Sequence, residues 1–273
     1  MKSKFGEINS VVTKLVGDMK RVGLSARRLG SAAVKRKHLE LATGVSLSAM
    51  TPRDITLMNA EFAQVASTDK LADRMVKMLT DQNGLALGCQ VDLYEHGLQA
   101  ASRCFDDLLE ETKRLAAGGR LEGLTPSGLS ADQEELVVVA LLHDVGETLT
   151  PINHGEVAAA MLRPYISPRN YWMLMHHEIF QLFYYGEAAG VADHTLREEL
   201  RESPHWDACE RFCRDWDQIA FDGSYVTYEL DFFMPMVHRV LSKPVYGHMG
   251  HKEEIINRLK AGMAAGYPTE VAE

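Results

Sequence analysis

The chain has 273 residues, which is enough to bury a substantial core in one large domain or in a domain with an extension. Although 46% of the residues are hydrophobic, no apolar run approaches the roughly 18 residues that span a bilayer, so we expect no membrane partner. The net charge of −9 argues against a nucleic-acid groove, and the four cysteines form no C-x-x-C pair, which indicates reduced thiols and a cytoplasmic protein.

Basic residues are concentrated near the N-terminus. Residues 1–44 carry ten Lys or Arg and three acidic residues, a balance of +7, which leaves −16 on the remaining 229 residues. We therefore predict a basic extension over residues 1–45 and a main domain over residues 46–273. The extension is interpreted as helices that dock on the acidic main domain. An organelle-targeting segment and a tail that binds nucleic acid or a membrane surface are the alternatives.

Helical periodicity dominates the first half of the main domain, and the alternation typical of strands is nearly absent. Residues 51–79 repeat apolar positions three and four apart, after a Thr-Pro start signal. Residues 90–117 read as a long amphipathic helix that Gly118 ends. Ser130 and Gln133 form a capping-box pattern that opens the most apolar helix of the chain, LVVVALLHDVG.

The second half continues with shorter helices. Asn153 is predicted to cap a short helix, HGEVAAAML, and Ser167 is predicted to start a longer one that ends near Gly186. Further helices are expected over residues 206–220 and residues 230–241. The sequence therefore predicts an all-α protein.

Imidazoles and carboxylates recur on the apolar faces of these helices. Five separate helices carry the set His96, His143, Asp144, His154, His176, His177 and Asp217. A single histidine in such a place is commonly a core residue with its hydrogen bonds satisfied, but a buried carboxylate without a partner costs several kcal/mol. Imidazole nitrogen and carboxylate oxygen together suit iron, manganese or zinc. The set as a whole therefore predicts a metal site.

Four segments of the chain resemble the HD-domain superfamily. LYEHGLQAA, ALLHDVGE, NHGEVAAAMLRP and FCRDWDQIA are similar to the metal-ligand helices of its two-metal branch, which includes inositol oxygenase and the phosphonate-cleaving HD oxygenases. The resemblance covers about residues 88–240. It implies a helical bundle of about five core helices, to which the N-terminal helical extension is added.

The resemblance also implies how the ligands are shared. Asp144 would bridge two metal ions, and His143, His96 and Asp217 would complete the shell of one ion. His154 and either His176 or His177 would complete the shell of the other. Alignment with inositol oxygenase favours His176, because the following His-Glu then matches the Asp-Glu of that enzyme.

By this resemblance the protein is a non-haem di-iron oxygenase, an oxidoreductase of the dioxygenase kind. It would hold a mixed-valent Fe(II)/Fe(III) pair and would use O2 to cleave a small hydroxylated substrate. Four neutral histidines and two aspartates leave a positive excess on two metal ions, which suits an anionic substrate. The alternative is a phosphohydrolase that uses manganese or another divalent ion to attack a phosphoester. The pattern indicates no oligomeric state.

Four further side chains are candidates for catalysis and substrate binding. Glu147, one turn after the His-Asp pair, would orient a ligand or transfer a proton, with a solvated helix-end carboxylate as the alternative. Tyr94, Gln181 and Tyr184 would contact substrate, with core packing as the alternative. Glu147 stands where inositol oxygenase has a lysine, so the resemblance does not extend to that enzyme's substrate.

Overall fold

The computed structural model describes residues 41–65, 68–118 and 123–242. The chain divides into two compact units, Met1–Glu61 and Phe62–Glu273, and each unit is described by itself. The basic segment that the sequence analysis predicts to be an extension falls mostly on residues 1–40, which lie outside the described residues. The predicted boundary near residue 45 therefore stays a prediction.

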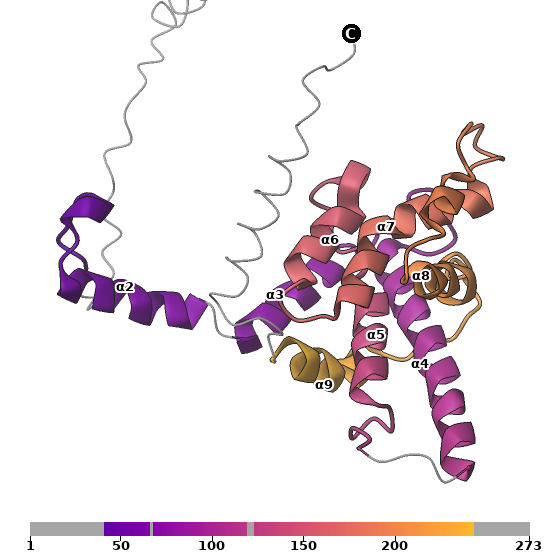
Figure 1. The fold of residues 1–273 in the computed structure, drawn as a ribbon, viewed down its shortest axis with the longest axis horizontal. Coiled ribbons are helices and arrows are strands. Elements are labelled where there is room, and N and C mark those ends of the chain that lie inside the picture. Colours follow the sequence, from indigo (N-terminus) through magenta and orange to yellow (C-terminus); the bar gives the residue numbers. More distant parts are fainter. Residues whose placement is uncertain (1–40, 66–67, 119–122, 243–273) are drawn as a thin grey trace, which may run out of the picture. The chain divides into compact units, whose positions relative to one another are not determined.

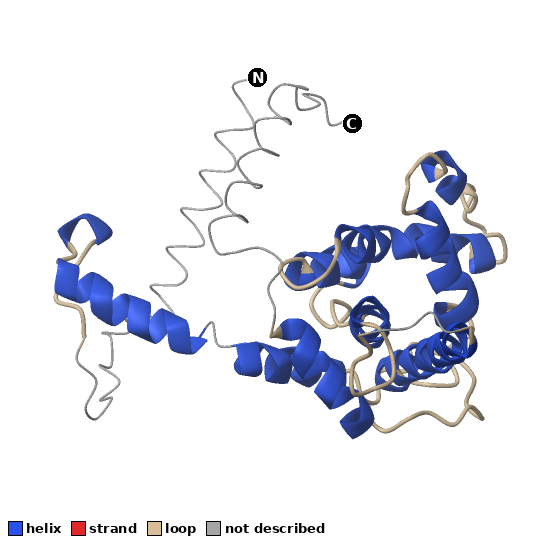
Figure 2. Cartoon of the chain, turned by 60° about the horizontal axis from the view of Figure 1, so that its bottom comes forward, coloured by secondary structure: helices blue, strands red, loops and turns tan. Residues whose placement is uncertain are grey.

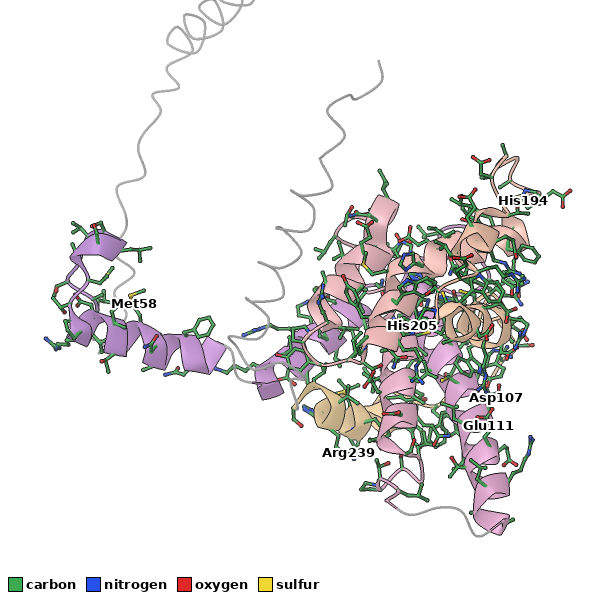
Figure 3. All side chains as sticks on the ribbon, in the orientation of Figure 1. Met58, Asp107, Glu111, His194, His205 and Arg239 are labelled. Carbon is green, nitrogen blue, oxygen red and sulfur yellow. The ribbon has the colours of Figure 1, made fainter. Side chains whose placement is uncertain are left out.

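The first unit contains a short 3-10 turn, Leu47–Ala49, and the start of helix α2, Pro52–Val65. Thr51 and Asp54 cap α2 reciprocally: the Thr51 N–H donates to Asp54 Oδ2 at 2.9 Å, and the Asp54 N–H donates to Thr51 Oγ1 at 3.2 Å. Figure 3 shows Met58 on this helix. The periodic segment 51–79 is thus divided into α2 and a second helix, α3.

The described part of the second unit consists of helices joined by loops, and no strand occurs there (Figure 2). With α2, the described residues form eight α-helices. Those of the second unit are α3 (Thr68–Thr80), α4 (Leu93–Ala117), α5 (Ala131–Leu142), α6 (His154–Leu162), α7 (Pro168–Tyr185), α8 (Trp206–Phe212) and α9 (Leu230–Leu241). None of the described helices is both long enough and apolar enough to cross a bilayer. The predicted all-α fold is confirmed.

Helix α5 lies inside the bundle and packs against α3, α4, α7 and α9 (Figure 1). The residues from Val137 to Leu142 are all buried. Because its apolar residues surround the helix instead of lining one face, α5 is stable only when other helices cover it on all sides. The His-Asp pair follows this central helix directly, and it therefore lies in the interior of the bundle.

The predicted helix starts can be compared with the hydrogen bonds. The capping box of Ser130 and Gln133 is confirmed, with the Gln133 N–H at 3.2 Å from Ser130 Oγ and the Ser130 N–H at 2.9 Å from Gln133 Oε1. Ser167 also caps its helix. Asn153 is the N-cap residue of α6 as predicted, but its side chain accepts no hydrogen bond from that helix and instead accepts one from the hydroxyl of Thr150 at 2.5 Å.

Helix α8 continues as a π-helix over Cys213–Asp217, where the sequence predicts one uninterrupted helix. The Gln218 N–H donates to the Cys213 carbonyl at 3.0 Å, five residues back, so the segment contains one residue more per turn than an α-helix. Trp216 fixes this turn, because its indole N–H donates to Asp107 of α4 at 2.9 Å (Figure 3). The wider turn changes the direction in which Asp217 points.

A partly buried ion pair joins α5 to α9. Arg239 (Figure 3) donates from Nε to Glu134 Oε2 at 3.0 Å, and the hydroxyl of Thr125 donates to Glu134 Oε1 at 2.6 Å. Burial alone would raise the pKa of Glu134, but the Arg239 guanidinium and the hydroxyl lower it below its usual value. Glu134 is thus ionised and satisfied near neutral pH, and it holds α9 against the central helix.

Gly97 allows α4 to approach α5 closely, next to His96. A Cβ at this position would lie 2.9 Å from the carbonyl oxygen of Leu141 and 3.0 Å from Leu79 Cδ1. We expect Gly97→Ala to lower the free energy of unfolding by about 1–3 kcal/mol, because the backbone of α5 has no room to yield. Urea unfolding of the variant measures the change.

The matched control is Gly118→Ala, at the C-terminal cap of the same helix. There φ is −86° and a Cβ would meet only the carbonyl of Leu115 at 3.4 Å. The control should remain within about 0.5 kcal/mol of the wild type. Equal stability of both variants would show that α4 and α5 can separate without loss.

Candidate metal centre

Six of the predicted ligands come together inside the second unit. They are separated by up to 121 positions along the chain, and each exposes 7% of its surface or less. His96 lies in the first turn of α4, His143 at the C-terminal cap of α5 with Asp144 after it, His154 at the start of α6, His177 within α7, and Asp217 at the end of the π-helix.

Four donor atoms form the first half of the cluster. His96 Nε2 lies 3.1 Å from His143 Nε2. Asp217 Oδ1 lies 3.2 Å from His96 Nε2 and 3.4 Å from His143 Nε2. Asp144 Oδ2 lies 3.3 Å from His96 Nε2 and 3.2 Å from His143 Nε2. Two imidazoles and two carboxylates thus surround one point.

The second half uses the other oxygen of the same aspartate. Asp144 Oδ1 lies 3.1 Å from His154 Nε2 and 3.2 Å from His177 Nε2. The two imidazole nitrogens are 3.2 Å from each other. Asp144 is therefore shared between the two halves, one carboxylate oxygen to each.

These spacings match those of donors bound to a common ion. Nitrogen and oxygen atoms held at about 2.0–2.2 Å from a metal in tetrahedral or octahedral geometry lie about 2.8–3.6 Å apart. All the donor separations within each half fall inside that interval. The arrangement can hold one ion in each half.

The tautomers of the four histidines also favour a cation. Each Nδ1 lies at hydrogen-bond distance from a backbone carbonyl and donates its proton there. His96 donates to Ala220 O at 2.9 Å, and His143 donates to Ala140 O at 2.8 Å. His154 donates to Pro151 O at 3.1 Å, and His177 donates to Leu174 O at 2.8 Å. In the neutral imidazoles the four Nε2 atoms therefore carry lone pairs. Lone pairs that converge in a buried site repel one another unless a cation lies between them.

The electrostatics of the metal-free protein show the same deficit of positive charge. Burial lowers the pKa of His96, but hydrogen bonds to Asp144 and Asp217 outweigh it and raise that pKa to about 9. Burial likewise lowers the pKa of His154, and Asp144 raises it to about 9. When the imidazoles are neutral, Asp217 Oδ1 is fully buried without a hydrogen-bond donor. Bound metal ions would supply the charge that protons supply otherwise.

The neighbours of Asp217 and His177 hold them in place. Gln181 of α7 donates from Nε2 to Asp217 Oδ2 at 2.7 Å, which leaves Oδ1 to face the histidines. Gly155 lets α6 approach α7, since a Cβ there would lie 2.7 Å from His177 Cε1 and 2.9 Å from Glu178 Oε1. The Gly155 N–H donates to that same Glu178 oxygen at 2.7 Å. The close approach brings His154 against His177.

His177, and not His176, faces the cluster. His176 Nδ1 donates to the carbonyl of Trp172 at 2.7 Å, and its ring stacks on the Trp172 ring at 4.2 Å. Adjacent side chains on a helix diverge by about 100°, so only one of the pair can point at Asp144. The preference for His176 that alignment suggested is therefore corrected in favour of His177.

Gln82 is a site residue that the sequence analysis missed. It is fully buried just after α3, and its Nε2 donates to the backbone carbonyl of Asp144 at 2.5 Å. This hydrogen bond crosses 62 positions of the chain and fixes the backbone of the shared aspartate. No local pattern marks Gln82, because its partner is a main-chain atom of a distant segment.

A cavity of about 580 Å³ opens onto the cluster. The polar part of its lining, called the polar wall, consists of Asp144, Glu147, His154, Gln181, Tyr184, Tyr185 and Gln218. The largely apolar part, called the apolar wall, consists of Ala86, Leu87, Cys89, Val91, Leu93 and Phe221. Three of the four predicted catalytic and substrate-contacting residues, Glu147, Gln181 and Tyr184, line it.

Tyr94, the fourth, does not line this cavity. It packs against the hydrophobic core, and burial followed by the charges of Glu229 and Asp231 raises its pKa. Tyr94 lies two positions from His96, which turns it about 200° away around α4. We correct its predicted role from substrate contact to packing.

Glu147 lies behind one of the histidines. Its Oε1 is 3.1 Å from His154 Nδ1, whose proton is donated to the Pro151 carbonyl, so the carboxylate lies beside the ring and stabilises positive charge there. Burial raises the pKa of Glu147, against the influence of His154. The carboxylate reaches both the imidazole and the cavity.

The neighbouring histidines provide a matched pair of variants. If His177 belongs to the second half of the cluster, His177→Ala should remove at least half of the bound metal per chain. His176→Ala should leave the metal content within about a tenth of the wild type, because that ring lies against Trp172. Elemental analysis of the purified variants measures both. Equal losses in the two variants would contradict the assignment.

Among curated proteins no similar sequence was found. Residues 108–210 match the family model described as HD domain. The match contains His143, Asp144, His154 and His177, and His96 and Asp217 flank it on either side. Together with the all-helical bundle around Asp144, this match supports placing the chain in the HD superfamily, whose domain implies a metal-dependent enzyme.

Proposed function

We propose that this protein is a non-haem di-iron oxygenase that oxidatively cleaves a small hydroxylated molecule. The observation that carries the proposal is the division of the cluster into two halves that share the Asp144 carboxylate and contain four imidazoles whose Nδ1 atoms donate to backbone carbonyls. Nitrogen-rich sites of this kind suit iron better than magnesium or calcium. The cluster opens onto a cavity with room for a small organic molecule.

Each half supplies a shell for one ion. His96, His143 and Asp217 would hold the first ion with Asp144 Oδ2. His154 and His177 would hold the second with Asp144 Oδ1, which leaves that ion fewer protein ligands. When bound, an iron pair supplies both Lewis acidity toward a substrate hydroxyl and electrons for the reduction of O2.

The protein's own side chains bind and orient the substrate. Gln181 uses its Nε2 on Asp217 and has its carbonyl oxygen left to accept a hydrogen bond from a hydroxyl in the cavity. Tyr184 and Gln218 add further polar contacts on the same wall. Glu147 stands beside His154 Nδ1 and at the cavity surface, so it can accept a hydrogen bond from a donor group of the substrate.

The apolar wall of the cavity excludes water from the reacting end of the substrate. Leu93 and Phe221 lie on this wall, and the Phe221 ring stacks on the His96 imidazole with 4.3 Å between centroids. An apolar wall beside the cluster strengthens the electrostatic interactions within it and protects reactive species from solvent.

A metal-dependent phosphohydrolase is the second candidate, and the match to the HD-domain model favours it, because that domain implies metal-dependent hydrolases. The lining of the cavity favours a phosphohydrolase less than it favours an oxygenase. A phosphoester is commonly held by Arg or Lys as well as by metal, and no Arg or Lys from the described part of the chain lines this cavity. We therefore place oxygenase chemistry first.

The two candidates differ in what they need from the metal. We expect protein purified without oxygen to contain about two irons per chain and to give, on partial oxidation, the magnetic resonance signal of a coupled Fe(II)/Fe(III) pair. Polyols, amino alcohols and phosphonates are then screened for substrate-dependent O2 uptake, which Asp144→Ala should abolish. His176→Ala, whose ring faces Trp172, serves as the control.

A hydrolase would behave differently in the same preparation. Zinc, magnesium or manganese can activate water for attack on phosphorus, so a hydrolase works without oxygen and without iron. Phosphate release from phosphoesters under anaerobic conditions, at a rate that survives replacement of iron by manganese, would overturn the oxygenase proposal.

A further inference from the structure

Two carboxylates outside the metal shells lie close behind His154. Its Nδ1 is 3.1 Å from Glu147 Oε1 and 3.6 Å from Glu178 Oε1. With Asp144 and Asp217 they make four carboxylates at the site, whose charge of −4 balances two divalent ions and leaves +1 on an Fe(II)/Fe(III) pair. The positive excess that the six ligands alone suggested is therefore reduced by two charges, which weakens the reason to expect an anionic substrate.

The cavity wall agrees with this charge balance. Its polar side chains outside the cluster are the amides Gln181 and Gln218, the phenols Tyr184 and Tyr185, and the carboxylate Glu147. No Lys or Arg among the described residues lines it. An anion would leave water for a wall without a positive side chain, whereas a cation would meet a carboxylate.

Glu147 has one oxygen left for a ligand. Oε1 faces His154 Nδ1, and nothing among the described residues donates a hydrogen bond to Oε2. The side chain is 14% exposed, and it forms part of the cavity surface. A donor group on the substrate can therefore reach this carboxylate, and a protonated amine would form the strongest such contact.

The apolar wall of the cavity can contact a hydrocarbon portion of a ligand. Leu87 lies at the cavity and also exposes 70% of its surface, so it forms part of the mouth. Its backbone has φ of +49°, a conformation that costs a non-glycine residue about 1–2 kcal/mol. Val91 and Leu93 continue this apolar wall.

We propose that the cavity takes a hydroxylated molecule that carries a protonated amine and a hydrocarbon portion, with Glu147 as the residue that selects the amine over a carboxylate or phosphonate. The hydroxyl would lie toward Asp144, the amine at Glu147 and the hydrocarbon along Leu87 and Val91. This inference rests on the proposed function only in that it treats the cavity as the substrate site.

Cys89 offers a direct measure of occupancy. It is exposed and lines the cavity, whereas the other three cysteines of the chain, Cys104, Cys209 and Cys213, are buried. Alkylation by iodoacetamide should thus occur at Cys89 alone in the folded protein. A molecule bound in the cavity should slow that alkylation.

The experiment uses the iron-loaded full chain under anaerobic conditions, with three unbranched probes of equal length: aminohexanol, hexanediol and hydroxyhexanoate. We expect aminohexanol to protect Cys89 with an apparent Kd about tenfold below that of hexanediol, as one charge-assisted hydrogen bond would give. Hydroxyhexanoate should protect least. Glu147→Gln should bring aminohexanol to the level of the diol, because Gln keeps a polar side chain of the same size beside His154 Nδ1 but lacks the charge.

The matched control is Glu95→Gln, an exposed glutamate on α4 that does not line the cavity. It should retain the preference for the amine. Protection by hydroxyhexanoate equal to that by the amine, protection by none of the probes, or a preference that survives Glu147→Gln would overturn the inference. The order of the three probes on the unaltered protein decides the charge argument even if Glu147→Gln lowers the iron content.

The outcome is separable from that of the oxygenase proposal, because binding is measured without O2. Selective protection by the amine in a protein that shows no O2 uptake would support this inference and contradict the oxygenase proposal. O2 uptake driven by an anionic substrate would support the oxygenase proposal and contradict this inference.

Discussion

The structure depends on the repulsion among seven buried donor atoms that converge from six residues. Each of the four imidazoles donates its Nδ1 proton to a backbone carbonyl, and their Nε2 atoms face one another and the carboxylates of Asp144 and Asp217 at 3.1–3.4 Å. Without a cation such a group would be destabilising in the interior of a bundle. The same group binds metal tightly, because folding has already brought the ligands together.

The rest of the bundle serves to hold these atoms in place. Helix α5 is buried on all sides and therefore delivers Asp144 to the centre. Gly155 lets a second helix approach closely enough for His154 to meet His177. The π-helix turns Asp217 inward, and Gln181 occupies its outer oxygen. The cavity then meets the cluster on the side that carries Glu147.

Much of this follows from local sequence, and some of it does not. The capping box at Ser130 and the apolar run after it identify α5, and imidazoles on separate apolar helices identify the candidate ligands. The choice of His177 depends on the rotation of α7, which apolar residues on both sides leave undetermined. The extra residue in the turn before Asp217 arises from tertiary packing of Trp216, and Gln82 contacts a backbone atom 62 positions away. The charge of the site also changes once Glu178 is seen beside His154.

The central claim is that Asp144 is shared by two metal ions, one at each carboxylate oxygen. Diffraction at the iron absorption edge, from crystals grown without oxygen, tests it directly. The account predicts two anomalous peaks on either side of the Asp144 carboxylate, about 3.5–4 Å apart, one within reach of His96 and the other within reach of His154. A single peak, or a second peak that does not contact Asp144, would contradict it.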